Sequence, residues 1–533
     1  MRKSVIDKYR TKLAAGSIDR RQFVLTALAA GASLPIALSM ANKVQAATPK
    51  KGGTLRLAIA GGSTTDTLAP GTLNDDGGRL VSWAVRSSLT EISPDGSLAG
   101  DLAESWDVSP DAKTWTVMLR KGVSFHSGKT VDADDVVASF NVHRGEDSKS
   151  SAKSLLDQVD EIRTDGKDKV VFSLKGGNAD FAVVLSDYNL FILPAKDGQI
   201  DPLSKDGTGT YKLSEFDPGV RAMLTRDPNG WKDGRGHFEA AEVTYVADAL
   251  ARTTALRSRS VDVVNRVDLK TVKLLQAVPD VKVEEVTGTQ HYTIPMHTDT
   301  APFTDNNVRM ALKHAIDRQA MVDKILLGHG KVANDHPIAP SNRYFAKDIP
   351  QREYDPEKAR FYLKQAGLDS LKVQLSAADA AFSGAVDAAV LYSDAAAKAG
   401  IEIEVVKVAN DGYWDNIWLK APWCFSYWTG RPTEDWMFSQ AYAPDANWNE
   451  SRWKNPRFAE LLIAARTELD EAKRSAMYEE MQLLVRDDGG SVIPMYSNYV
   501  WATGASIAHD EAVAANWDLD GNRCIERWWF AES

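Results

Sequence analysis

Cysteine is scarce in this sequence, because 533 residues contain only Cys424 and Cys524. Two cysteines so far apart cannot supply a Cys-x-x-Cys metal site, and the nine histidines provide no pair at the four-residue spacing of helical metal ligands. No metal ligands are therefore predicted. In an oxidising compartment the two thiols could pair around a loop of about 100 residues, which the chain-entropy model values at up to about 4.7 kcal/mol. Two buried free thiols are the alternative, and the sequence leaves both open.

Motifs for nucleophilic catalysis and phosphate binding are also absent. The sequence has no Gly-x-Ser-x-Gly elbow and no phosphate-binding loop of the Gly-x4-Gly-Lys-Ser/Thr pattern. Asp132, Asp134 and Asp135 lack the glycine and the distant glutamate of a calcium loop, so they are better explained as acids at the start of a helix. The sequence predicts no catalytic residue, no cofactor and no enzyme, and a peptide or amide hydrolase is the weakest alternative function.

Long apolar runs are limited to the N-terminal region. Beyond residue 46 no stretch approaches 18 uninterrupted apolar residues, so no membrane-spanning helix is predicted there. Excess positive charge is lacking too, since the chain has a formal net charge of −10. This balance disfavours nucleic acid and anionic membrane surfaces as partners.

Residues 1–46 have the pattern of an export signal. Basic residues come first, the pair Arg20-Arg21 stands directly before Gln22-Phe23-Val24-Leu25, and an apolar run continues to Met40. Val44-Gln-Ala46 then forms a small-residue cleavage pattern. The arginine pair resembles a twin-arginine signal, which a receptor reads as an address. We expect cleavage of this signal and a periplasmic mature protein, and an uncleaved membrane anchor is the alternative.

Asn410–Trp453 is the stretch most typical of a small-molecule site. It holds seven of the 15 tryptophans, and its glycines and prolines interrupt any long helix or strand. Irregularly spaced aromatic rings supply apolar walls, and a few charged groups fix the orientation of a ligand. A Trp-rich core under long loops is the alternative. The ligand-binding candidates, which include one loop residue and one tyrosine outside this stretch, are Thr64, Tyr292, Tyr413, Trp414, Trp428, Thr429, Gly430, Arg431, Asp435 and Trp436.

Three other segments have clear local patterns. Residues 51–60 predict a turn followed by a strand. Residues 102–143 predict a hairpin with its turn at Ser109-Pro-Asp-Ala-Lys113, followed by a helix capped by Asp132. Residues 302–318 contain apolar residues at helical spacing, so this segment is expected to pack in a core, with its arginines in ion pairs or in solvent.

Residues 102–143 closely resemble the signature of the extracytoplasmic solute-binding proteins of peptide- and nickel-type ABC importers, the bacterial solute-binding protein family 5. Gly207-Thr-Gly-Thr-Tyr211 is similar to the family's Gly-Thr-Gly-Pro-Tyr element, with Thr210 in place of proline. Residues 302–318 and Tyr354-Asp-Pro-Glu-Lys-Ala-Arg360 resemble two further family segments. The resemblance extends over nearly the whole mature chain.

This resemblance implies an α/β fold, a two-lobed periplasmic-binding-protein clamshell with a discontinuous first lobe and an extra family-specific domain. We expect the first lobe to comprise residues 47–90, 208–297 and 490–533, the extra domain residues 91–207, and the second lobe residues 298–489. Closure of the lobes around a ligand is the expected motion.

The resemblance also implies the function. A family member would be a monomeric periplasmic protein without a membrane anchor that captures a solute for an ABC permease in the inner membrane. The solute would be a peptide or an amino-acid derivative. A ligand sensor or a chaperone on the same fold is the alternative, because a fold does not determine a function.

One position departs from the family pattern. Peptide binders of this family place an aspartate for the peptide α-amino group after a Trp-x-x element, whereas Arg431 follows Trp428-Thr429-Gly430 here. The charge at this position is therefore inverted. The sequence leaves two explanations open: Arg431 binds an anionic group of the solute, or it pairs with Glu434 or Asp435.

Overall fold

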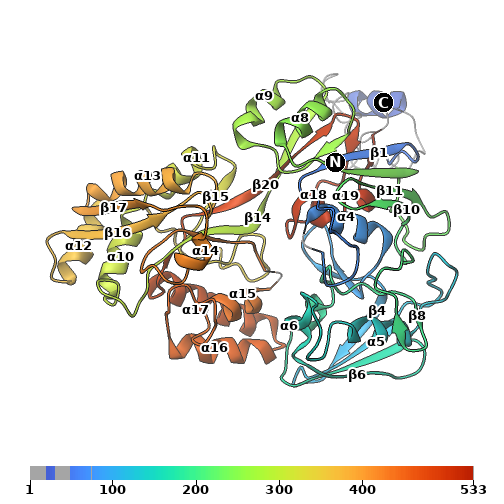
Figure 1. Ribbon diagram of the computed structural model, residues 1–533, viewed down its shortest axis with the longest axis horizontal. Helices are drawn as coiled ribbons and strands as arrows, with labels where there is room; N and C mark the ends of the chain where they lie inside the picture. Colours follow the sequence, from blue (N-terminus) through green and yellow to red (C-terminus); the bar gives the residue numbers. More distant parts are fainter. Residues whose placement is uncertain (1–19, 30–48, 74, 432, 532–533) are drawn as a thin grey trace.

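The computed structural model describes residues 20–29, 49–73, 75–431 and 433–531. Of the predicted export signal only helix α2 (Arg20–Ala29) is described, and the rest of that prediction lies outside the described residues. Figure 1 shows three bodies, two of which are joined by the long strands β14 and β20. No helix among the described residues has the length and apolar character needed to cross a membrane.

The upper-right body in Figure 1 is built on a ten-stranded sheet of mixed direction. β1 lies in its centre, parallel to both β12 and β13, and three of its buried side chains, Leu55, Leu57 and Ile59, enter the core. The predicted strand at residues 51–60 is thus confirmed. The strands of this sheet are β1 (Thr54–Ile59), β10 (Tyr211–Asp217), β11 (Arg221–Arg226), β12 (Ala240–Tyr245), β13 (Val263–Val264), β14 (Val281–Pro295), β15 (Gly330–Val332), β18 (Ser426–Trp428), β19 (Ser491–Val492) and β20 (Met495–Gly504).

Short helices cover this sheet. The first, α4, begins where the carboxylate of Asp75 accepts a hydrogen bond from the Gly78 N–H, at 2.8 Å, which satisfies one of the free donors of the first turn. Its buried residues Leu80, Val81 and Trp83 pack on the core formed with β1. The remaining elements of this body are α4 (Asp76–Val85), α8 (Ala249–Arg257), η1 (Leu269–Thr271), α9 (Val272–Gln276), β21 (Ile507–Ala508), α18 (Asp518–Asn522), α19 (Cys524–Arg527) and β22 (Trp529–Phe530).

The lower-right body in Figure 1 contains a four-stranded antiparallel sheet in the order β4-β5-β7-β6. The predicted hairpin and helix are confirmed. Asp132 and Asp135 form a reciprocal capping box at the start of α5, which explains the acids there without a metal. Its elements are β2 (Thr90–Ile92), β3 (Leu98–Gly100), β4 (Ala103–Val108), β5 (Thr114–Leu119), α5 (Ala133–Asn141), α6 (Lys153–Leu156), β6 (Val159–Thr164), β7 (Lys169–Leu174), α7 (Phe181–Val184), β8 (Ala195–Lys196) and β9 (Gln199–Ile200).

The left-hand body in Figure 1 packs helices around the parallel pair β16-β17. The helix predicted within residues 302–318 is confirmed as α10, and its apolar face lies in the core. Arg318 forms an ion pair with Asp335 at 2.6 Å, and Arg309 pairs with Asp488, so both arginines are structural. The elements are α10 (Asn306–His314), α11 (Arg318–Lys324), α12 (Pro356–Gln365), β16 (Leu371–Ala377), α13 (Ala385–Ala397), β17 (Ile401–Lys407), α14 (Tyr413–Asn416), α15 (Glu434–Ala441), α16 (Pro456–Thr467) and α17 (Glu471–Asp487).

Continuous β-structure connects the left-hand and upper-right bodies. β14 pairs with β20 in one register from Val281 to Thr287, and the register then shifts before His291 pairs with Tyr496. Beyond that irregularity β14 pairs with β18 and β19, which belong to the left-hand body. A register shift of this kind bends a strand locally. The bend lies where the two bodies meet.

The two cysteines are free, so the disulfide alternative is wrong. Cys424 lies in the left-hand body, beside Ser376 at the end of β16. Cys524 begins α19 and packs in the hydrophobic core around β1. The chain carries them into two different bodies, and a disulfide needs Cα atoms about 4.4–6.8 Å apart. Burial raises the pKa of the Cys424 thiol to about 12, so it stays protonated and unreactive.

Candidate ligand cavity between the three bodies

A cavity of about 900 Å³ lies where the three bodies meet. A volume of this size is typical of small-molecule sites. Residues 179–188 of the lower-right body, 340–343 and 430–434 of the left-hand body, and 513–523 of the upper-right body all contribute to its walls. Its aromatic wall residues are Trp83, Trp106, Trp115, Tyr188 and Trp517.

The wall formed by the upper-right body rests on a buried network of charges. The Arg523 guanidinium lies 3.6 Å from the centroid of the Trp83 ring and pairs with Glu91 and Glu526, each at 3.0 Å. Burial opposes ionisation of Glu526, but Lys232, Arg523 and Arg235 outweigh it and lower its pKa to about 2. These ion pairs hold the Arg523 side chain against the Trp83 ring at the cavity wall.

A second buried ion pair connects two bodies at the edge of the cavity. Asp180, which precedes α7, accepts two hydrogen bonds of 2.5 Å from the Arg474 guanidinium of α17. Both side chains are at least 95% buried. The Ala179 N–H also donates to the Arg466 carbonyl, at 2.6 Å. The lower-right and left-hand bodies are therefore fastened to each other beside the cavity.

Two of the predicted ligand-binding residues, Gly430 and Arg431, line the cavity. A Cβ atom on Gly430 would lie only 1.5 Å from Thr289 Oγ1, so this loop lies directly against β14. The close approach places Arg431 at the cavity wall. Its guanidinium also lies over Trp428, with 5.3 Å between its carbon and the ring centroid. Thr429 supports it by accepting a hydrogen bond of 2.8 Å through its carbonyl.

Four tryptophans of the Trp-rich stretch form a chain of ring contacts outside the residues that line the cavity. Trp414 contacts Trp418, Trp418 contacts Trp448, and Trp448 contacts Trp428, with centroids 5.7–6.1 Å apart. The buried Glu450 carboxylate accepts a hydrogen bond of 2.6 Å from the Trp418 indole. Most of this stretch therefore has the Trp-rich packing that was the alternative to a pocket.

The remaining candidates are distributed over other surroundings. Tyr292 packs on Phe382, and Tyr413 is buried and donates a hydrogen bond to the Phe425 carbonyl. Thr64 is exposed on its loop, away from the residues that line the cavity. Asp435 pairs with Arg466, and Trp436 packs against the core of the lower-right body. Whether any of them touches a solute stays a prediction.

Sequence reasoning missed most of the wall. Trp83, Tyr188, Trp517 and Arg523 all lie more than 60 residues from the Trp-rich stretch, and no local pattern connects them to it. The only signal that the sequence offered for these residues was an isolated aromatic residue among small and polar residues, as at Asn516-Trp517. Such a signal is too common to select four residues from a whole chain.

Comparison with known proteins identifies the chain. The profile of the family described as "Bacterial extracellular solute-binding proteins, family 5 Middle" matches residues 97–450. The chain belongs to this family. Solute binding outside the cytoplasm is the role of family 5 proteins, so this chain is a substrate-binding protein of a transport family.

Relatives and solved structures agree with the family 5 assignment. The dipeptide-binding protein of Escherichia coli (strain K12) is 25% identical over 461 residues, which cover 79% of this chain and 83% of that protein. The oligopeptide-binding protein AppA of Bacillus subtilis (strain 168) is 25% identical over 526 residues, 92% of this chain and 94% of that protein. The structure of HbpA2 from Haemophilus parasuis matches with a TM-score of 0.78 at 21% identity, over 86% of this chain and 96% of that chain. The predicted α/β binding-protein fold is confirmed.

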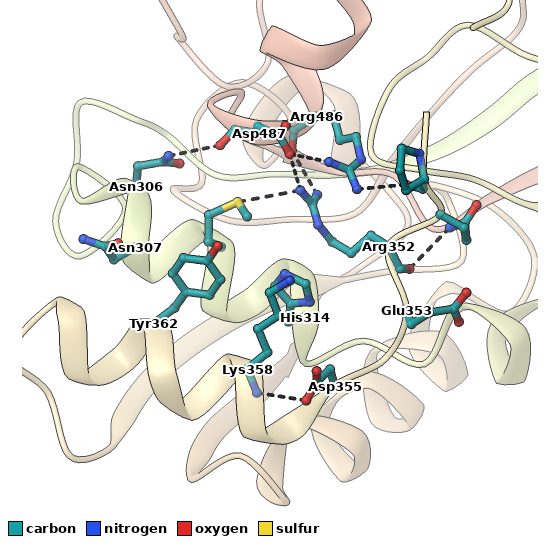
Figure 2. Close-up of a pocket in the computed structure, with 13 residues that line it drawn as sticks. Asn306, Asn307, His314, Arg352, Glu353, Asp355, Lys358, Tyr362, Arg486 and Asp487 are labelled. Carbon is teal, nitrogen blue, oxygen red and sulfur yellow. Dashed lines mark hydrogen bonds and ion pairs between the residues drawn. The ribbon is translucent and has the colours of Figure 1, made fainter. Parts of the chain in front are cut away.

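This family 5 protein has a second, smaller cavity of about 500 Å³ on the left-hand body, shown in Figure 2. Three of its charged residues pair with one another. Arg352 and Arg486 each donate to Asp487 at 2.6 Å, and Asn306 donates to the Asp487 carbonyl at 3.0 Å. Burial lowers the pKa of His314 to about 4, so this ring is neutral at pH 7. This cavity is smaller than the one between the three bodies, and its arginines already have a counter-charge in Asp487.

One relative is named as the nickel-binding periplasmic protein of Escherichia coli (strain K12). Among the residues whose positions are given, no three His, Cys, Asp or Glu side chains come together as potential metal ligands. The acids beside the main cavity are held instead by arginines or by backbone N–H groups. The main cavity is thus lined by aromatic, polar, acidic and arginine side chains.

Glu434, which also lines the cavity, makes stability depend on pH. Burial raises the pKa of its carboxyl to about 7, and nearby Asp180 adds to this, against the hydrogen bond that the Tyr344 N–H donates and the charge of Arg474. In the unfolded chain the pKa would be about 4.3. The folded state therefore holds the proton longer, and the stability this contributes is complete below about pH 4.3 and is lost as the pH rises through about 7.

We therefore expect Glu434→Gln to flatten this dependence, because glutamine keeps the acceptor for Tyr344 and cannot ionise. Between about pH 5 and about pH 8 the wild-type free energy of unfolding should fall by about 2–3 kcal/mol more than that of the variant. Urea unfolding of both proteins across this range measures the difference. Parallel pH profiles would show that Glu434 keeps an ordinary pKa.

Proposed function

We propose that this protein captures a peptide or an amino-acid-derived solute in the cavity between the three bodies and delivers it to an ABC permease. The observation that carries the proposal is the cavity itself, whose walls come from all three bodies. Relatives over most of the chain are named as dipeptide- and oligopeptide-binding proteins. Aromatic rings in the walls would bury apolar side chains of the solute, and the polar groups would orient its backbone.

The anionic side of the cavity supports a solute that carries an amine. Asp187 also lines the cavity, and its carboxylate accepts hydrogen bonds of 2.9 Å from the Asn189 N–H and side-chain amide. Burial raises the pKa of this carboxyl. Within the described part of the chain, no ion pair includes Asp187. An ammonium group would therefore gain a charged partner there.

The domain assignment also belongs to this proposal. We assign residues 47–90, 208–297 and 490–533 to lobe I, residues 91–207 to the extra domain and residues 298–489 to lobe II. β14 and β20 would form the hinge, because they are the strands that connect the upper-right and left-hand bodies (Figure 1). The working unit is a monomer that closes on its solute without chemical turnover.

Binding of defined peptides tests the proposal. The purified mature protein is heated with alanine di-, tri- and tetrapeptides, and a bound peptide should raise the melting temperature further as its concentration rises above the Kd. Recovery of the peptides unchanged would agree with a binding protein, and their cleavage would indicate a hydrolase. Deletion of the gene should abolish peptide uptake. Normal uptake with intact binding would favour the sensor alternative.

Export by the twin-arginine route is a separate prediction. Replacing Arg20-Arg21 by Lys-Lys should leave the precursor in the cytoplasm, because a receptor reads the arginine pair as an address. Immunoblots of periplasmic and cytoplasmic fractions measure the distribution. A variant with Lys8 and Arg10 exchanged, which keeps the charge of the basic segment, is the control. Normal periplasmic yield of the Lys-Lys variant would contradict the prediction.

A further inference from the structure

Arg431 is a charged group at the cavity wall whose hydrogen-bond partners are all neutral. Its Nε atom donates to the Gln440 side-chain oxygen. Its Nη1 atom donates to the Thr429 carbonyl at 2.8 Å and to the Gly430 carbonyl at 3.3 Å. The Trp428 and Trp436 rings lie 5.3 and 6.0 Å from its guanidinium carbon. These contacts hold the guanidinium in place and leave its charge uncompensated.

The two acids that follow Arg431 in sequence are engaged elsewhere. The Glu434 carboxylate accepts from the Tyr344 N–H at 2.8 Å, and Asp435 pairs with Arg466 at 2.8 Å. Thr433 caps α15, and both acids lie in the first turn of that helix. This arrangement removes the pairing that the sequence had left open. Throughout the described ranges, no ion pair includes Arg431.

Other arginines around the cavity are compensated. Arg523 pairs with Glu91 and Glu526, and Arg343 pairs with Glu471. At the cavity edge Arg474 pairs with Asp180. Burial of Arg431 lowers its pKa, with the Tyr188 hydroxyl acting in the opposite direction. A guanidinium removed from water without a counter-charge is costly, and a protein keeps one at a ligand cavity when the ligand supplies the charge.

We propose that Arg431 binds a carboxylate of the solute, so that the protein selects solutes with a free carboxyl group. This inference rests on the proposed function and names the solute class for the same cavity. The planar fork of a guanidinium matches the two oxygens of a carboxylate. Gln440 and the Thr429 carbonyl position the fork, and Trp428 supports its face. Together with the Asp187 carboxylate, which also lines the cavity, Arg431 gives the walls groups of both signs, which suits a zwitterionic peptide.

Esterification of the carboxyl groups of the peptide ligands tests this inference with the wild-type protein. The purified mature protein is titrated with a tryptic digest of casein, and in parallel with the same digest after conversion of its carboxyl groups to methyl esters. The same rise in melting temperature should need roughly 10- to 100-fold more of the esterified digest, the range of one charged hydrogen-bonded contact. Because no substitution is involved, the result does not depend on a variant folding.

Variants at Arg431 provide the second measurement. Arg431→Met should bind the free digest roughly 10- to 100-fold more weakly than wild-type and should no longer distinguish it from the ester. Arg431→Lys keeps the charge but loses the fork, so its affinity should be intermediate. Arg457→Met is the matched control, because Arg457 is an exposed residue on α16 that pairs with Glu480 outside the cavity. The melting temperature of each variant without digest shows that it folds.

The possible outcomes distinguish a failure of the carboxylate inference from a failure of the proposed function. Equal stabilisation of wild-type by the free and esterified digests, or unchanged affinity of Arg431→Met, would overturn the carboxylate inference alone. A wild-type protein that is stabilised by neither digest would overturn the proposed function, and the inference with it. Weaker binding of both the ester and Arg431→Met, with normal binding by Arg457→Met, is the result expected.

Discussion

Replacing Asp180 by asparagine is expected to lower the free energy of unfolding by about 3–5 kcal/mol. The Asp180 carboxylate receives both hydrogen bonds of the Arg474 fork, and the two side chains are almost completely buried. Asparagine has nearly the same shape but no charge. In the variant the Arg474 guanidinium would be buried without a counter-ion. In the wild-type protein Asp180 raises the pKa of this guanidinium. Urea unfolding monitored by tryptophan fluorescence measures the loss.

An exposed ion pair on the same helix provides the control. Glu471, at the start of α17, pairs with Arg343, and both side chains are more than half exposed. Glu471→Gln should therefore cost only about 0–1 kcal/mol. The double variant Asp180→Leu, Arg474→Met should recover much of the stability, since it removes the buried charge with its partner. Equal losses for Asp180→Asn and Glu471→Gln would show that burial does not matter here.

The Asp180→Asn substitution should also affect the cavity. Asp180 belongs to the lower-right body and Arg474 to the left-hand body, and the pair fastens them beside the cavity. Without this ion pair, a smaller fraction of the molecules has the arrangement in which all three bodies can contact a solute. The apparent affinity for a solute falls by the same fraction. Titration of Asp180→Asn with an alanine tripeptide should therefore show weaker binding even where the variant is folded.

Replacing Gly430 by alanine is expected to abolish solute binding at concentrations that saturate the wild-type protein. The added Cβ would lie 1.5 Å from Thr289 Oγ1 and 1.9 Å from Thr289 Cβ, far inside van der Waals contact. Either the 430–434 loop or β14 must move, at a cost of about 1–3 kcal/mol. Since Gly430 is followed directly by Arg431, the movement displaces the guanidinium from the cavity wall. Thermal shift with an alanine tripeptide measures binding.

A second substitution can test whether the clash with Thr289 causes the loss of binding. Thr289→Gly removes both clashing atoms, so the Gly430→Ala, Thr289→Gly double variant should bind again, apart from a cost of about 0.5–1 kcal/mol for glycine in a strand. Gly176→Ala is the control, because a Cβ there would meet nothing within 4 Å. It should leave stability and binding nearly unchanged. Normal binding by Gly430→Ala would mean that the loop moves without effect on the site.

Much of the fold followed from local sequence patterns. The alternating strand at residues 51–60, the hairpin and Asp132-capped helix of residues 102–143, and the apolar face of α10 all appear as predicted. Each depends on contacts within a few residues or on a periodicity that any core imposes. The family assignment followed from four motifs of this kind in order, and the profile match confirms it.

The pairing of charges and thiols could not be predicted in the same way. Arg431, Glu434 and Asp435 lie within five residues, so the sequence made them apparent partners. The helix that begins after Thr433 instead places Glu434 at the Tyr344 backbone and Asp435 at Arg466. Similarly, Cys424 and Cys524 were possible partners until the fold placed them in different bodies. Proximity in sequence did not determine proximity in space.

The sequence by itself determined the family and the class of fold, and it singled out the region that places an arginine at the cavity between the three bodies. Only the tertiary structure decided which aromatic rings face that cavity. Tryptophans near in sequence, such as Trp414 and Trp448, pack on one another, whereas Trp83 and Trp517, more than 400 residues apart, share a wall. The physical reason is that a cavity between bodies is lined by the residues left uncovered when three separate cores pack together. That packing depends on long-range contacts, which no local pattern records.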